Sequence, residues 1–227
     1  MFTSLSPAEW ECLVLSLQVA LCAAAATAIA GVPTGWLLAR KSFPGKSALD
    51  AVVHAPLVLP PVAIGYLLLL TLGRKGWAGG WLWERFHLGV AFTWWAAVIA
   101  SGVVAFPLVV RSVRLAVELV DPRLEEAAGT LGANRWRVFT TVTLPLAMPG
   151  VAAGVVLAFA RSLGEFGATI TFAGNLAGQT RTLPLAVYTS MQLPGGETGA
   201  MRLVMISVLL SVGAICVSEW MARRRPN

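Results

Sequence analysis

Charged residues are scarce in this chain. They make up 12% of its 227 residues, whereas 57% are hydrophobic, and the charged share is about half of what is usual in a soluble domain. This balance predicts an all-α polytopic membrane protein with one domain over residues 1–227 and a lipid bilayer around it. The net charge of +6 comes from basic residues that flank apolar runs, so it indicates membrane orientation rather than nucleic-acid binding.

The residue groups that make up catalytic and metal sites are also missing. The three cysteines, Cys12, Cys22 and Cys216, lie in apolar runs without metal-like or redox-like spacing, so we expect them to be small packing residues. No nucleophile elbow or pair of catalytic carboxylates stands out. We therefore expect no catalytic, cofactor-binding or metal-binding residue, and a membrane-embedded hydrolase is a disfavoured alternative.

A phosphate-binding loop is absent as well. Gly45-Lys46-Ser47 has the right ending, but the motif G-x-x-x-x-G-K-[ST] needs a glycine at position 40, where Arg40 stands. The segment is better interpreted as a basic loop that opens a helix. If ATP drives this protein, a partner must bind and hydrolyse it.

Five apolar runs are long enough to cross a bilayer. The first 11 residues contain Glu9 and Glu11 but no Lys or Arg, which disfavours a cleaved signal peptide. We expect the fourth run to become a span only near Leu146, and a sixth span only if 182–196 is re-entrant. The five runs cover 12–39, 51–73, 88–110, 138–160 and roughly 200–222.

Two segments should interrupt their helices at membrane depth. Two consecutive prolines break the second run, because proline removes a backbone donor, and such a break needs protein or water to satisfy the freed carbonyls. Two glycines favour a break around Glu165, and Arg161 stands four residues before it, at ion-pair spacing. The segment either lines or gates a polar path, or holds a static ion pair. The candidate pathway or gate residues are Pro60, Pro61, Arg161, Gly164, Glu165 and Gly167.

Three smaller signals concern packing and the membrane surface. The sequence GVAAG at 150–154 is a small-xxx-small pattern for close helix packing. Trp77, Trp81 and Trp83 suit a membrane interface. His54 is better explained as a hydrogen-bonded packing residue than as a proton carrier.

The segment 121–150 is the most charged long interval, and it lies between two apolar runs. Asp121 is a suitable N-cap, Pro122 suits the first helical position, and Glu125 and Glu126 suit the positive end of the helix dipole. Gly132 allows a turn. The pattern predicts a helix, a turn and a second helix, which serve either as a solvated connector or as a docking site for a partner.

The residue spacing favours docking. Glu126-Ala127-Ala128, then Gly132, then Val142-Thr143-Leu144-Pro145 resembles the EAA loop of ABC-importer permeases, E-A-A-x3-G-x9-I-x-L-P, and only Val142 departs from it. The resemblance implies an ABC type I importer permease fold, with about five transmembrane helices and a cytoplasmic coupling helix within 121–145. The residues expected to couple to an ATPase are Leu124, Glu125, Glu126, Ala127, Ala128, Leu131, Gly132, Trp136, Phe139, Leu144 and Pro145.

A wider resemblance covers most of residues 43–200. Stretches such as HAPLVLPPVAIGYLLLL, LAFARSLGEFGATITFAGN and QTRTLPLAVYT resemble the permease subunits of molybdate ABC importers. The resemblance implies a homodimer, two ATPase subunits that carry ATP and Mg, and a periplasmic protein that delivers molybdate or tungstate. Sulfate and thiosulfate permeases look similar around LGEFGA, so they remain the main alternative. An ion-gradient-driven secondary transporter is less favoured, since neither paired midplane charges nor internal repeats are evident.

Charge asymmetry supports an orientation in the inner membrane. A cytoplasmic EAA loop places the N-terminus in the periplasm and the C-terminus in the cytoplasm, which leaves eleven Lys and Arg on the inner side against six elsewhere. The eleven are at 40, 41, 46, 111, 114, 123, 135, 137 and 223–225.

Overall fold

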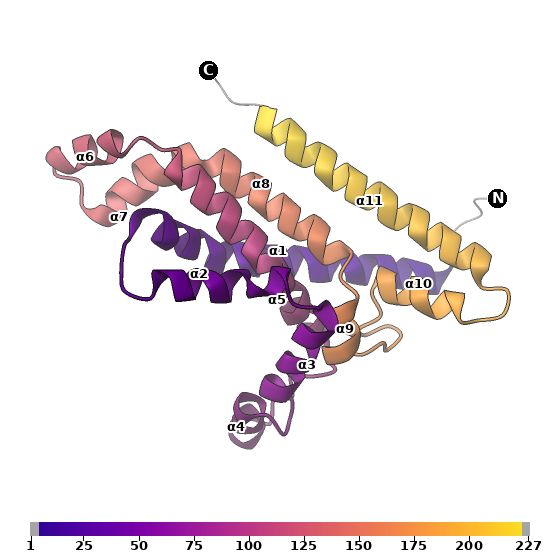
Figure 1. Ribbon diagram of the computed structural model, residues 1–227. Coiled ribbons are helices and arrows are strands. Elements are labelled where there is room, and N and C mark those ends of the chain that lie inside the picture. Colours follow the sequence, from indigo (N-terminus) through magenta and orange to yellow (C-terminus); the bar gives the residue numbers. More distant parts are fainter. Residues whose placement is uncertain (1–4, 224–227) are drawn as a thin grey trace.

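The computed structural model describes residues 5–223, with side chains to residue 217, and every regular element in this part of the chain is a helix (Figure 1). Arg224 and Arg225 of the basic C-terminal cluster lie outside the described residues. The α-helices are α1 (Pro7–Arg40), α2 (Lys46–His54), α3 (Pro61–Leu72), α4 (Trp77–Phe86), α5 (Trp94–Glu118), α6 (Pro122–Thr130), α7 (Arg135–Val138), α8 (Leu144–Leu163), α9 (Gly167–Phe172), α10 (Leu183–Met191) and α11 (Glu197–Arg223). A 3₁₀ turn (Ala55–Leu57) follows α2, and a π-helical turn (Phe139–Thr143) joins α7 to α8.

The expected number of membrane spans is confirmed. Four helical stretches within the described residues are long and apolar enough to cross a membrane: α1, α5, Arg135–Leu163 and α11. A fifth is formed if α2 with its 3₁₀ turn and α3 count as one span, bent by 114°. No sixth span forms over 182–196, because α10 has nine residues and is too short to cross.

Two helix boundaries differ from those expected from the sequence. The third span begins at Trp94 and continues past Arg111 and Arg114 to Glu118; Arg114 pairs with Glu118 at 2.9 Å and with Asp50 at 3.1 Å. These ion pairs stabilise the charged end of the helix. Leu146, expected near the start of the fourth span, lies within one continuous helix that runs from Arg135 to Leu163.

The central helix is α5, and α1 approaches it closely through two glycines. Gly31 and Gly35 form a small-xxx-small pattern on α1. A Cβ atom at Gly35 would lie 2.8 Å from the Val113 side chain and 2.9 Å from the Val110 carbonyl oxygen. At these two positions a side chain larger than hydrogen therefore does not fit between the helices.

Helix α8 packs on α5 in the same way. A Cβ atom at Gly154 would lie 2.8 Å from Ser112 Cβ, and Ser112 Oγ donates a hydrogen bond to the Gly150 carbonyl at 2.7 Å. The close packing predicted from GVAAG is therefore confirmed. Because α1 and α8 both use glycines against α5, three long helices form the compact centre of the fold.

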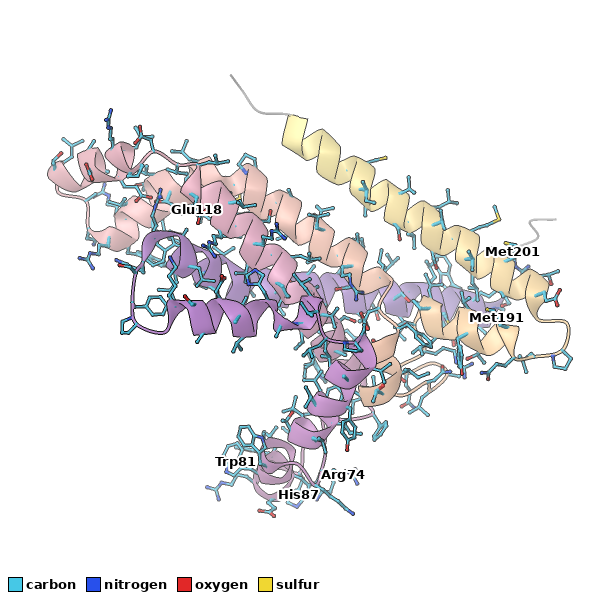
Figure 2. All side chains as sticks on the ribbon, in the orientation of Figure 1. Arg74, Trp81, His87, Glu118, Met191 and Met201 are labelled. Atoms are coloured by element: carbon cyan, nitrogen blue, oxygen red, sulfur yellow. The ribbon has the colours of Figure 1, made fainter. Side chains whose placement is uncertain are left out.

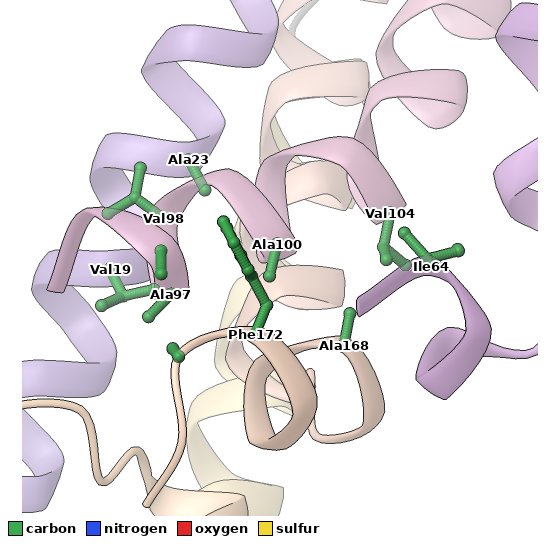
Figure 3. Close-up of a cluster of buried hydrophobic side chains, with 11 residues drawn as sticks. Val19, Ala23, Ile64, Ala97, Val98, Ala100, Val104, Ala168 and Phe172 are labelled. Atoms are coloured by element: carbon green, nitrogen blue, oxygen red, sulfur yellow. The ribbon is translucent and has the colours of Figure 1, made fainter. Parts of the chain in front are cut away.

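Both predicted helix breaks are present, and they pack against each other. Helix α3 starts at Pro61 after the bend, and α8 ends at Leu163 before α9 starts at Gly167. A Cβ atom at Gly65 would lie 2.6 Å from the Ala168 carbonyl oxygen, and one at Gly167 would lie 2.8 Å from Pro61 Cβ. Figure 3 shows the apolar cluster beneath this contact, where Phe172 of α9 lies among side chains of α1, α3 and α5.

Helix α4 extends away from the rest of the fold at the end of α3 (Figures 1 and 2). Trp77 and Trp81 are exposed there, while the Arg74 guanidinium lies 4.1 Å from the Trp83 ring centroid. Exposed tryptophans beside a basic side chain suit the expected membrane interface.

The surroundings of His54 and the three cysteines test the roles expected for them. His54 Nδ1 lies 2.9 Å from the Asp50 carbonyl oxygen, as expected for a hydrogen-bonded packing residue. Cys12 is buried in a core cluster, but Cys22 and Cys216 are exposed on helix surfaces, so the packing role expected for the cysteines holds for Cys12 alone. The exposed pair lies on faces that this chain does not cover.

We predict that Gly35→Ala destabilises the protein. The added methyl would overlap Val113 and the Val110 carbonyl, and overpacking of this kind costs about 1–3 kcal/mol. The thermal unfolding midpoint in detergent should fall. Gly213→Ala is the matched control, since nothing lies within 4 Å of its Cβ position; an equal fall in both variants would contradict the close contact.

Candidate coupling surface and translocation path

The segment 121–145 folds as a helical elbow, formed by α6 and α7. Asp121 caps α6 by accepting a hydrogen bond from the Arg123 amide at 2.9 Å, and Pro122 occupies the first helical position. Gly132 has a φ of +86°, which favours glycine, and Asn134 then caps α7 through the Arg137 amide at 2.8 Å. The predicted cap and turn are confirmed.

Part of the predicted coupling set faces outward from the elbow. Leu131 is 89% exposed and Trp136 is 73% exposed, and Leu124 is also exposed. Glu126, Ala127, Gly132 and Pro145 are exposed as well, while Ala128 is half-buried. The elbow therefore presents large apolar side chains and small residues together, a composition that suits contact with another protein.

The other members of the predicted set point into the fold. Glu125 accepts hydrogen bonds from Arg40 and Thr143. Phe139 packs between two tryptophans, with ring centroids 5.6 Å from Trp36 and 5.7 Å from Trp136. Leu144 packs against the core between α1, α5 and α8. These three residues hold the elbow in place.

The π-helical turn before α8 follows from Pro145. A proline in a helix has no N–H for the carbonyl four residues earlier and clashes with it, and here that carbonyl belongs to Thr141. The chain opens instead, and the Leu144 amide donates to the Phe139 carbonyl five residues back. Because the helix continues through this turn, α7 and α8 remain one unit.

The predicted Arg161–Glu165 pair is formed at the end of α8. Arg161 Nη1 lies 2.7 Å from Glu165 Oε2, with side-chain exposures of 35% and 1%. Glu165 Oε1 also accepts a hydrogen bond from the Ala168 amide at 2.9 Å, so it caps the start of α9. The cation thus reaches the protein surface while the carboxylate stays inside.

The six candidate path residues do not all meet. Pro61 and Gly167 touch, and Arg161 and Glu165 pair, whereas Pro60 and Gly164 are exposed. Beside the break, the buried hydroxyls of Ser162 and Thr169 have no hydrogen-bond partner among the described residues. The arrangement is a polar, interrupted segment within an apolar fold.

Three residues of the elbow's attachment gave no signal as such in the sequence. From the sequence, Arg40 was interpreted only as a basic residue that sets membrane orientation, and Thr143 only as part of the EAA pattern. Trp36 had no predicted role. Arg40 and Glu125 stand 85 residues apart, so no local spacing predicts their contact.

Helices of membrane length, two interrupted helices packed together and a polar elbow at one end define the fold of an ABC transporter permease. The solved structure titled "Inward facing conformations of the MetNI methionine ABC transporter" has this fold, with a TM-score of 0.69 at 18% identity over 96% of this chain and 98% of that chain. Residues 31–225 match the family model for the binding-protein-dependent transport system inner membrane component, and the chain belongs to that family.

Curated relatives narrow the comparison further. The chain is 55% identical over 219 residues to the molybdenum transport system permease protein ModB of Escherichia coli K12, covering 96% of each. It is 38% identical over 199 residues to the sulfate transport system permease protein CysT of the same organism, covering 86% of this chain and 72% of the relative. These relatives are transport permeases.

We predict that Glu165→Ala weakens the fold at the α8–α9 break. It removes the ion pair and the α9 cap together, and a hydrogen bond to a charged group typically contributes about 1.5–3 kcal/mol. The unfolding midpoint in detergent should fall, while Glu84→Ala, at an exposed glutamate on α4, should change it little. If both variants behave alike, Glu165 does not hold this break.

Proposed function

We propose that this chain is the permease subunit of an ATP-driven importer that moves molybdate, and its analogue tungstate, across the inner membrane. The observation that carries the proposal is the difference in identity: 55% to a molybdenum permease over nearly the whole chain, against 38% to a sulfate permease. Sulfate or thiosulfate import is the second candidate, supported by that lower but extensive identity.

The complete importer would contain two copies of this permease, two ATPase subunits that bind ATP and Mg, and a periplasmic binding protein. The fold supports this plan, since its elbow presents an exposed apolar surface to a partner. The N-terminus would lie in the periplasm and the C-terminus in the cytoplasm. Ion pairs at opposite ends of α1 fit such an axis: Glu9 with Arg202 at one end and Arg40 with Glu125 at the other.

Transport would proceed by alternating access. When the ATPases close on ATP, the two elbows approach each other, and α8 carries that displacement toward its other end because α7 and α8 form one helix. That other end is the break at Glu165, packed against the Pro60–Pro61 bend. A change in the packing of these two interrupted segments would open one side of the pore and close the other.

The charge at the break suits a path for a tetrahedral dianion. The positively charged head of Arg161 reaches the surface while its partner carboxylate is buried, so a passing anion would meet the cation first. A permease needs to hold its anion only briefly, because a tight site midway would slow release. Selectivity would therefore reside mainly in the binding protein.

Reconstitution of the full complex in liposomes tests the proposed substrate. Molybdate or tungstate with its binding protein should stimulate ATP hydrolysis and drive uptake, and sulfate should do neither. Equal stimulation by sulfate would favour the second candidate. Uptake in the absence of ATPase subunits would instead indicate a secondary transporter.

We predict that Leu131→Asp weakens the association of ATPase subunits. Leu131 is the most exposed large apolar side chain of the elbow, and a charge there would oppose burial in a docking interface. Loss of an interface anchor costs at least about 2 kcal/mol, so the dissociation constant for the ATPase subunit should rise more than ten-fold in a pull-down titration. Leu193→Asp, at an exposed leucine before α11, is the control; if it is equally damaging, the elbow is not the docking site.

A further inference from the structure

One carboxylate oxygen ties the elbow to two other parts of the fold. Arg40 Nε and Nη2 both lie 3.1 Å from Glu125 Oε1, and Thr143 Oγ1 donates to the same oxygen at 2.7 Å. Arg40 is the last residue of α1, and Thr143 is the last residue of the π-helical turn. Glu125 thus joins α6 to the end of α1 and to the start of α8.

Arg40 extends the same cluster to α5. Its Nη2 donates to the Val120 carbonyl at 2.8 Å, just after α5 ends, and carbonyls at a helix C-terminus need such a donor. The planar guanidinium supplies several donors in fixed directions, which a lysine ammonium cannot reproduce. Arg40 therefore holds the chain at both ends of the connection from α5 to α6.

Phe139 and Leu144 pack the start of α8 against the core, whereas α6 is tied to α1 through the Arg40–Glu125 ion pair. A groove of about 350 Å³ separates the elbow from the end of α1, and Trp36, Glu126 and Arg135 are among the residues that line it. Among the described residues, Trp36 with Phe139 is the one ring–ring contact between α1 and the stretch from α6 to the π-helical turn. Arg40 and Glu125 are only 16% and 20% exposed, so salt screens their attraction less than that of surface ions.

We propose that Arg40, Glu125 and Thr143 form the joint that transmits displacement of the elbow to α1, α5 and α8. These are positioning residues, distinct from the outward-facing side chains that would contact an ATPase. Two neighbouring glutamates face opposite ways: Glu126 is exposed on the elbow, whereas Glu125 points inward. This inference rests on the proposed function, because it concerns how ATP-driven motion enters the permease.

Uncoupling of hydrolysis from transport is the expected effect of breaking the joint. Glu125→Gln preserves size and Arg40→Lys preserves charge, so each should leave the ATPase subunits bound and hydrolysing ATP. Anion transported per ATP should fall at least about five-fold, the lower end of the range for coupling between two sites. The matched control is the Asp50–Arg114 pair, also 3.1 Å apart: it joins α2 to α5 and touches neither α6 nor α7, so Asp50→Asn should leave the ratio unchanged.

A distance measurement separates this inference from the identity of the transported anion. Spin labels at Thr130→Cys on α6 and Ser42→Cys after α1, in a background without the native cysteines, report the elbow relative to α1 in the full complex. With the joint intact, this distance should stay constant when an ATP analogue is added; in Glu125→Gln it should change. An unchanged transport ratio, an equal loss in the control pair, or the same label distances in both proteins would overturn the proposal. A wild-type complex that transports no molybdate would count against the proposed function alone.

Discussion

The close approach of α5 to α1 and α8 is the constraint on which the rest of the structure depends. In a bilayer, lipid tails satisfy apolar side chains as well as another helix does, so association relies on tight van der Waals packing. Glycines at 31, 35, 150 and 154 remove the side chains that would keep the three axes apart. With that centre fixed, α3 and α9 meet on one side of it and the α6–α7 elbow is held at one end (Figure 1).

Local chemistry made several features predictable. Two consecutive prolines break the second apolar run, Gly132 turns the elbow, Asp121 caps α6, and Arg161 meets Glu165 one helical turn away. Each of these rests on residues within a few positions of one another, where backbone geometry leaves few options. The fold class and the family followed from composition and from the spacing of the elbow pattern.

Contacts between distant segments were not predictable from one sequence. Nothing near Pro61 indicates that Gly167 will touch it, and nothing near Arg40 indicates Glu125. A helix boundary was missed for a related reason: Arg111 and Arg114 seemed to end a span, but α5 continues to Glu118, and Arg114 pairs with Asp50 of α2. The interpretation of 124–145 as one coupling set likewise missed that Glu125, Phe139 and Leu144 face inward.

The π-helical turn ahead of α8 also fixes how far the side chains of α7 are rotated around the helix axis relative to α8. Widening a helical turn by one residue is equivalent to an insertion, and each residue of an α-helix advances the chain by about 100° around its axis. Without Pro145 to impose that extra residue, the side chain of Trp136 would be rotated by about 100° around the helix axis. Pro145, seven residues after α7 ends at Val138, thus sets the direction in which the exposed side chains of the elbow face.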